Sequence, residues 1–221
     1  MRQFLLASAM VLAAPVLIAS GAQAVPMVGL TVQSGGTSSF QSGSVDPTGY
    51  FNFKNVTVGN FTVTNNAGQF FLPNYLDLSS QSVSSIAGGT LVITLTGTGF
   101  TSLPGATDWL TQFTGNVARG SATVSEQTYI NDSEILENPG CSVGCSLLSS
   151  VSLNSSNTAS GFSDGGSFAL TEVITIVATG VENLSLDASI SDVPEPMSLA
   201  LVGTGLAGLG LIRRRAARKT A

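Results

Sequence analysis

The sequence predicts an all-β protein: a single β-sandwich or jelly-roll-like domain between a signal-peptide helix and a C-terminal transmembrane helix. Three observations favour this fold class. Gly, Ser, Thr and β-branched residues dominate the middle of the 221-residue chain, and only 10% of all residues are charged. Short runs of β-formers, about eight to ten in all, end at Gly, Asn or Ser, as in a sandwich. Between the two ends, no segment keeps the apolar spacing of an amphipathic helix. We expect three parts, with bounds 1–24, 25–192 and 193–221.

The first part is typical of a secretory signal peptide. Arg2 precedes an apolar run over residues 4–18, and Ala22 and Ala24 form the small-residue pattern that signal peptidase recognises. We expect cleavage after Ala24, so that the mature chain begins at Val25 outside the cytoplasm. The alternative is an N-terminal membrane anchor that is never cleaved.

Six runs in the middle part predict strands: residues 49–66, 89–99, 121–131, 146–156, 168–180 and 183–191. In the first, apolar residues alternate and Gly59-Asn60 indicates a hairpin turn. In the second, Leu91, Ile93 and Leu95 share one face and Val92 the other, as in a central strand of a sandwich. The polar segments 33–44 and 154–167 predict loops.

Cys141 and Cys145 enclose a three-residue segment after a Pro-Gly pair. Two nearby thiols in an oxidising compartment usually pair. A zinc site commonly uses His, which this chain lacks entirely, and a redox pair needs a C-x-x-C spacing. The sequence therefore predicts a structural disulfide that closes a turn, and no metal.

The middle part is strongly acidic. Residues 25–192 carry twelve Asp and Glu against two basic residues, Lys54 and Arg119, so their net charge is −10. A nucleic-acid ligand requires a basic face. We therefore exclude nucleic acid as a partner.

Apparent catalytic motifs lack their required setting. Ser163 lies in a G-x-S-x-G match, but the chain has no His to take its proton. Residues 203–208 match G-x-G-x-x-G inside an apolar run, with no Asp or Glu twenty residues later. Paired carboxylates of a glycosidase are defined by their separation in space, and nothing in the sequence indicates such a pair. We expect no enzyme activity and no cofactor.

One acidic cluster leaves calcium binding open. Asp132, Glu134 and Glu137 lie close together, and Asp164 lies in a Gly-rich segment. Calcium prefers several oxygen ligands from loops, but this spacing is not that of an EF-hand. A solvated acidic loop is the simpler interpretation.

The C-terminal part combines three features in a fixed order. They are Pro194, Glu195 and Pro196, then the uncharged residues 197–212, and then Arg213, Arg214 and Arg215. The apolar run corresponds to about 24 Å of helix, slightly short for a stable span. The arginines stay cytoplasmic by the positive-inside rule. The prolines keep their segment extended and outside the helix, where a membrane protease can recognise and cleave it.

This tail, together with the signal peptide, resembles the sorting signal of the PEP-CTERM proteins. The resemblance covers residues 193–221, with six residues after the arginines where many members stop sooner. It implies cleavage near Pro-Glu-Pro by an exosortase, a multi-pass membrane enzyme of Gram-negative bacteria. It also implies delivery to the cell surface or the extracellular matrix, often in species that make exopolysaccharide. Because family bodies vary greatly, it implies no activity for residues 25–192.

Several functions stay open. We favour an exported surface or matrix protein with a non-catalytic structural or interaction role. The alternatives are a carbohydrate- or calcium-binding module, in which Trp109, Tyr129 or the phenylalanines stack on sugars, and a simple unprocessed single-pass anchored protein. The expected partners are signal peptidase, an exosortase, the membrane through the tail helix, and exopolysaccharide.

Overall fold

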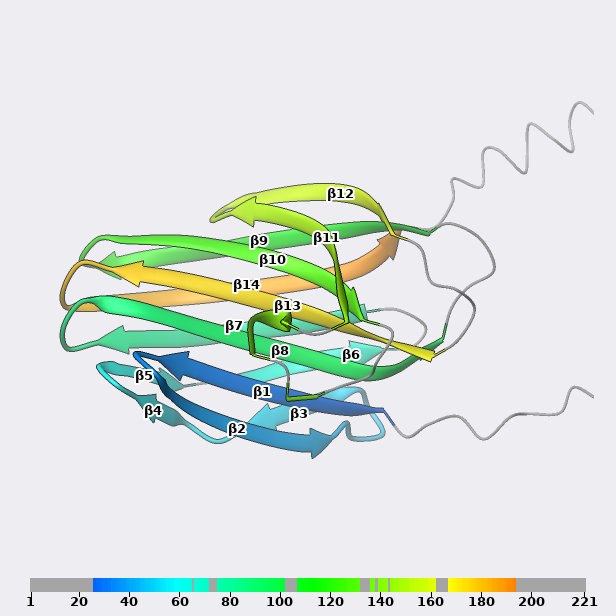
Figure 1. Cartoon of the computed structure of the whole chain (residues 1–221), viewed down its shortest axis with the longest axis horizontal. Helices are drawn as coiled ribbons and strands as arrows, with labels where there is room; N and C mark the ends of the chain where they lie inside the picture. The colour runs from blue at the N-terminus through cyan, green and yellow to red at the C-terminus, as the bar shows by residue number, and fades with distance from the viewer. Residues whose placement is uncertain are drawn as a thin grey trace, which may run out of the picture.

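The computed structural model describes residues 26–64, 66–71, 75–101, 107–131, 136–137, 139–142, 144–161 and 167–193. These residues form two antiparallel sheets that pack face to face, which confirms the predicted all-β sandwich (Figure 1). The described part contains no α-helix, and its one helical turn is a 3-10 helix at Pro139–Cys141. The expected signal peptide and most of the expected tail lie outside the described residues.

The first sheet has six strands in the order β11-β10-β13-β8-β1-β2. Their bounds are β1 Met27–Ser34, β2 Thr37–Ser44, β8 Gly89–Thr101, β10 Ala122–Asn131, β11 Cys145–Ser152 and β13 Ser167–Ala178. β13 lies between β8 and β10 and is buried along most of its length on both faces. Burial on both faces explains its nearly continuous apolar sequence.

The second sheet has eight strands. Six follow the order β12-β9-β14-β7-β5-β4, and β6 pairs with both β7 and β3. Their bounds are β3 Tyr50–Phe53, β4 Val56–Val58, β5 Phe61–Thr64, β6 Asn66–Phe71, β7 Tyr75–Ser85, β9 Thr107–Arg119, β12 Ser155–Gly161 and β14 Glu182–Val193.

The core lies between the two sheets. Leu91, Ile93 and Leu95 of β8 are fully buried, as their alternation predicts. The ring of Trp109 from the second sheet meets Phe168 of the first edge-on, with ring centroids 5.9 Å apart. Such contacts stabilise the sandwich by removing large apolar side chains from water.

The loop predictions for residues 33–44 and 154–167 are wrong in part, because two thirds of the first segment and half of the second form edge strands. Residues 37–44 form β2, which pairs with β1 from Met27↔Ser44 to Ser34↔Thr37. Gly35 and Gly36 make the turn between them with positive φ values of 55° and 82°. Residues 155–161 form β12, which pairs with β9. Ser and Thr dominate both strands because edge strands expose much of their surface to water, not because the segments are irregular.

The segment from Tyr50 to Phe71 is one long hairpin with an interruption. Its turn is at Gly59-Asn60, as predicted, with Val58 paired to Phe61. At residues 54–55 the strand is broken, so that the inward residues change from odd numbers before the break to even numbers after it. Asn66 Nδ2 donates to the carbonyl of Lys54 at 3.1 Å and holds the break in place. The break leaves Asn55 on the exposed side of the hairpin.

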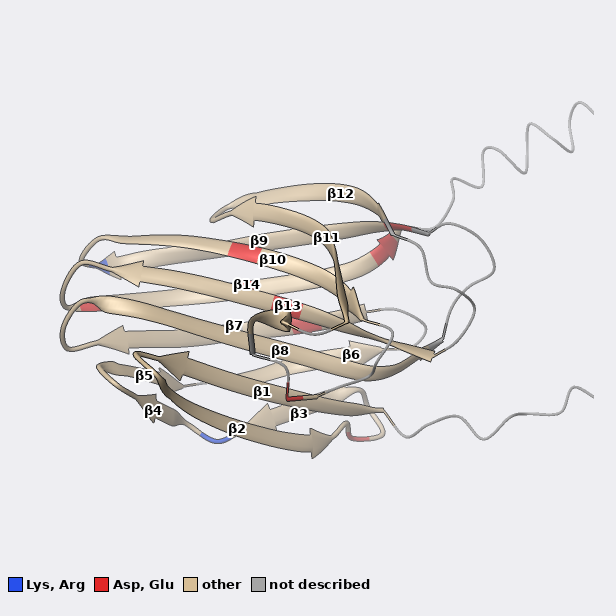
Figure 2. Cartoon of the chain, viewed as in Figure 1, with Lys and Arg blue, Asp and Glu red and all other residues tan. Residues whose placement is uncertain are grey.

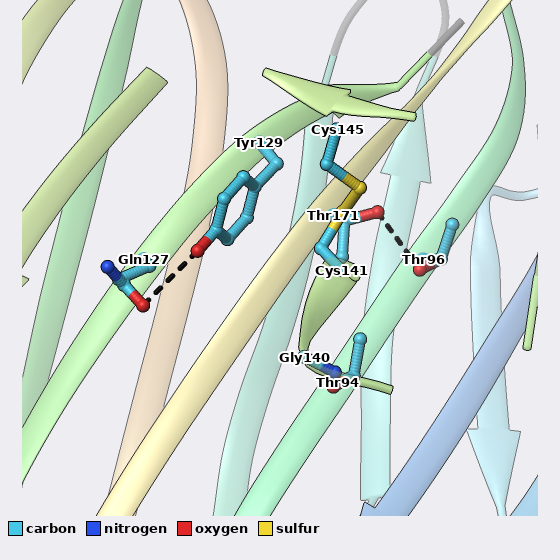
Figure 3. Close-up of a disulfide and its surroundings, with 8 residues drawn as sticks. All are labelled: Thr94, Thr96, Gln127, Tyr129, Gly140, Cys141, Cys145 and Thr171. Atoms are coloured by element: carbon cyan, nitrogen blue, oxygen red, sulfur yellow. Dashed lines mark hydrogen bonds between the residues drawn. A yellow bond between two sulfur atoms is a disulfide. The ribbon is translucent and has the colours of Figure 1, made fainter. Parts of the chain in front are cut away.

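Cys141 and Cys145 are joined by a disulfide that closes a short loop over the first sheet (Figure 3). The backbone N–H of Gly140 donates to Thr94 Oγ1 at 3.0 Å and ties this loop to β8. The Thr96 and Thr171 hydroxyls, 3.0 Å apart, join β8 to β13 close by. The disulfide therefore fastens a connection rather than the core.

We expect the double variant Cys141→Ser and Cys145→Ser to fold, with a free energy of unfolding about 2 kcal/mol lower than that of the oxidised protein. The cost is modest because the disulfide closes a very short loop. Urea unfolding of the oxidised, reduced and variant proteins measures it, and thiol labelling of exported protein should find neither cysteine free. Labelling of both thiols in exported protein would contradict the expectation.

Candidate functional site

The sorting segment begins where the folded domain ends. β14 runs to Val193, and its last residues pair with the start of β9, Asp192 with Trp109 and Val193 with Asp108. β14 lies between β9 and β7, so it is an interior strand of the second sheet. Its end and the start of β1 lie at the same end of the sandwich (Figure 1). Any protease that acts on residues 194–196 therefore works immediately next to the folded domain.

Most of the residues singled out in the sequence lie outside the described residues. These are the cleavage residues Ala22 and Ala24, the motif residues Pro194, Glu195 and Pro196, the arginines Arg213, Arg214 and Arg215, and Ser163, Asp132, Glu134 and Asp164. Glu137 is described and exposed. Within the described ranges, no three His, Cys, Asp or Glu side chains are placed to hold a metal ion. In the same ranges, no helix has the length and apolar character that crossing a membrane requires.

Trp109 and Tyr129, two of the aromatic residues considered for sugar stacking, lie in different surroundings. Trp109 is only 2% exposed and belongs to the core, so its face is not available to a ligand. Tyr129 is half-buried on β10, where its hydroxyl donates to Gln127 Oε1 at 3.2 Å beside the disulfide loop (Figure 3). Neither residue is the centre of an exposed aromatic surface.

Two glutamates lie inside the sandwich. Glu126 of β10 is opposite Ile174, and Glu172 of β13 is opposite Thr128, so the two carboxyl groups are diagonal neighbours on one face of the sheet. Both residues have no exposed surface. Their four carboxylate oxygens have no hydrogen-bond partner among the described residues. The neighbouring Thr128 hydroxyl instead lies 2.9 Å from that of Thr111, across the two sheets.

Burial controls the charge of this pair. It raises the pKa of Glu126 well above the ordinary value. Burial likewise raises the pKa of Glu172, and repulsion from Glu126, Asp77 and Asp187 raises it further. Burial also raises the pKa of Asp77 to about 6, although a hydrogen bond from Ser79 opposes the shift. Both shifts favour the neutral, protonated form of the two glutamates.

The glutamate pair does not have the setting of a glycosidase site. A catalytic pair must reach both sides of a glycosidic bond, and a general base must be ionised. Here both carboxyl groups are sealed between the sheets and held neutral. The pair is therefore part of the core and a source of pH-dependent stability.

Sequence reasoning missed these glutamates, although a signal was present. Glu126 has the same parity as Val124 and Ile130, and Glu172 the same parity as Leu170 and Ile174. Alternation along each predicted strand therefore places both side chains inward. What the alternation does not give is that the two strands are neighbours.

The surface of the described domain is poor in positive charge. Its basic residues are Lys54 and Arg119. In Figure 2 the blue segments are few, and red segments of acidic residues lie on both sheets.

The comparisons with known proteins concern the C-terminal segment. A search of curated proteins found no match. A family description, the PEP-CTERM protein-sorting motif, matches residues 192–215. The match begins on the last two residues of β14, continues through Pro194, Glu195 and Pro196, and ends at Arg215. A motif of this kind implies processing by an exosortase and an exported destination at the cell surface or beyond. The chain therefore carries a PEP-CTERM protein-sorting motif directly after its β-sandwich domain.

Proposed function

We propose that this chain is an exported surface or extracellular-matrix protein of a Gram-negative bacterium, with a β-sandwich that serves a non-catalytic structural or interaction role. The observation that carries the proposal is the sorting motif at residues 192–215, which follows the last strand without a linker. Signal peptidase removes residues 1–24, the apolar run holds the chain in the membrane, and an exosortase then releases or transfers the domain.

The non-catalytic role is supported by the chemistry of the domain. The chain has no His, so common triads and His-based metal sites are not available to it. The perturbed glutamates lie in the core, away from any substrate. The interaction role extends to exopolysaccharide, and a polar groove described below favours a saccharide partner.

We expect deletion of residues 194–221 to change the destination of the protein. An epitope placed at the exposed Gly35-Gly36 turn reports the domain without disturbing the motif. The full chain should pass through the inner membrane and reach the surface or medium as a shortened form. The deletion variant lacks the apolar run, so it should collect in the periplasm as a soluble protein. Blots of inner-membrane, periplasmic, surface and medium fractions measure this.

One control variant makes the fractionation decisive. Arg119→Gln alters a charge on the domain outside the sorting motif, and this variant should be distributed as the unaltered chain is. Identical distributions of the full chain and the deletion variant would show that the tail does not direct sorting.

A further inference from the structure

A polar groove on the outer face of the second sheet lies over β3, β6 and β7. It has a volume of about 440 Å³, and the side chains that line it include Tyr50, Asn52, Asn55, Gln69 and Ser79. This size is typical of a small-molecule site. None of the lining residues is charged.

The strand register explains why this part of the face is hollow. One row across the three strands consists of Tyr50, Gln69 and Asp77, and the next row consists of Asn52, Ala67 and Ser79. Side chains in a row lie about 5 Å apart, one strand spacing. The small Ala67 side chain between Asn52 and Ser79 leaves the hollow, and the break at residues 54–55 adds Asn55 beside it.

Tyr50 presents an aromatic ring to solvent from a fixed backbone. Its side chain is 51% exposed. The backbone N–H of Tyr50 donates to Asp46 Oδ1 at 2.9 Å, and its carbonyl accepts from the Asp46 N–H at 2.9 Å. Hydrogen bonds to the Asp46 carboxylate, from the Thr48 side chain first and then from Tyr50, lower its pKa and keep it ionised as an acceptor. The backbone that carries the ring is therefore already held in place before a ligand binds, which lowers the entropic cost of binding.

The polar side chains around the ring have unused hydrogen-bonding capacity. The carboxamides of Asn52, Asn55 and Gln69 have no side-chain hydrogen bond within the described part of the chain. Each carboxamide offers two donors and one acceptor. Sugar hydroxyls also donate and accept, and a pyranose ring has apolar C–H faces that pack on an aromatic ring.

We propose that this groove binds a neutral oligosaccharide, with a pyranose ring stacked on Tyr50 and its hydroxyls bonded to Asn52, Asn55 and Gln69. The ligand is neutral because Asp77 lies in the row of Tyr50 and because residues 25–192 include twelve acidic residues but only two basic ones. An anionic saccharide would be repelled. The proposal deepens the interaction role given above and rests on it.

The test uses the full chain, purified in a detergent that has no sugar headgroup. Calorimetry is run with neutral gluco-, manno-, galacto- and xylo-hexasaccharides, and with an alginate hexasaccharide as the anionic comparison. We expect at least one neutral hexasaccharide to bind, and Tyr50→Ala to weaken it at least about tenfold, because an aromatic anchor is lost. Asn52→Ala and Gln69→Ala should each weaken it several-fold.

Two variants separate recognition from folding. Tyr50→Phe keeps the ring and should bind within about twofold of the unaltered chain. Asn183→Ala removes an exposed carboxamide from β14 of the same sheet, outside the groove, and should leave the affinity unchanged. Binding to none of the neutral hexasaccharides, tighter binding to alginate, or binding that survives Tyr50→Ala would overturn the proposal.

The binding and fractionation experiments together distinguish the groove assignment from the sorting function. A chain that is sorted to the surface but binds no saccharide overturns the groove assignment and leaves the sorting function standing. A chain that binds a neutral hexasaccharide but stays unprocessed in the inner membrane overturns the sorting function and leaves the groove assignment standing.

Discussion

Replacing Pro194, Glu195 and Pro196 together with alanine is expected to stop processing of the tail while export and membrane insertion continue. Export depends on residues 1–24, and insertion depends on the apolar run and the arginines that follow it. Alanine favours helix, so the helix of the apolar run can extend toward the domain. Because β14 ends at Val193, the three replaced residues directly follow the folded domain in the sequence.

A blot for an epitope in the domain measures this result. The native chain should appear as a shorter form that has lost the arginines, and the triple variant as a longer form in the membrane. Lys219→Ala with Thr220→Ala alters the tail beyond the matched residues 192–215 and should be processed normally. In a strain that lacks its exosortase, the native chain should remain the longer form in the membrane, as the triple variant does. If native and variant chains have the same size and both stay in the membrane, the tail is a simple anchor.

The second large effect is a fall in stability as the pH rises, caused by Glu126 and Glu172. Their folded pKa values lie well above the ordinary value of 4.5 that applies to glutamates in the unfolded chain. A raised folded pKa gives stability that is complete below the unfolded pKa and is lost as the pH rises through the folded value. The free energy of unfolding should therefore decrease with increasing pH, by up to about 1.4 kcal/mol per pH unit for each proton involved.

Urea unfolding between pH 6 and pH 8 isolates these two groups. Asp77, whose pKa is raised to about 6, acts in the same direction mainly below that range. The double variant Glu126→Gln and Glu172→Gln should have a nearly flat profile, because neither amide titrates. Glu137→Gln changes an exposed glutamate and should keep the slope of the native protein. A native profile that is flat from pH 6 to pH 8, or a slope that survives in the double variant, would contradict this explanation.

The parts of the fold that were predicted correctly came from local sequence patterns. Alternation identified the strands around Leu91, Ile93 and Leu95, and Gly59-Asn60 identified a hairpin, because both features depend on neighbours in the sequence. The segments that form β2 and β12 were missed, since Ser- and Thr-rich edge strands have the composition of loops. Their strand structure depends on pairing with β1 and β9, which composition does not report.

The sequence by itself determined the sorting tail, because its three features are contiguous and are read in order along the chain. It also indicated inward positions for Glu126 and Glu172, through strand parity. Only the tertiary structure decided that these glutamates are neighbours, because that requires β10 to pair with β13, far along the chain. It likewise decided the groove, since Tyr50, Gln69 and Asp77 form one row only when β3, β6 and β7 pair in register. Long-range pairing is set by how whole faces pack together, which local sequence patterns do not specify.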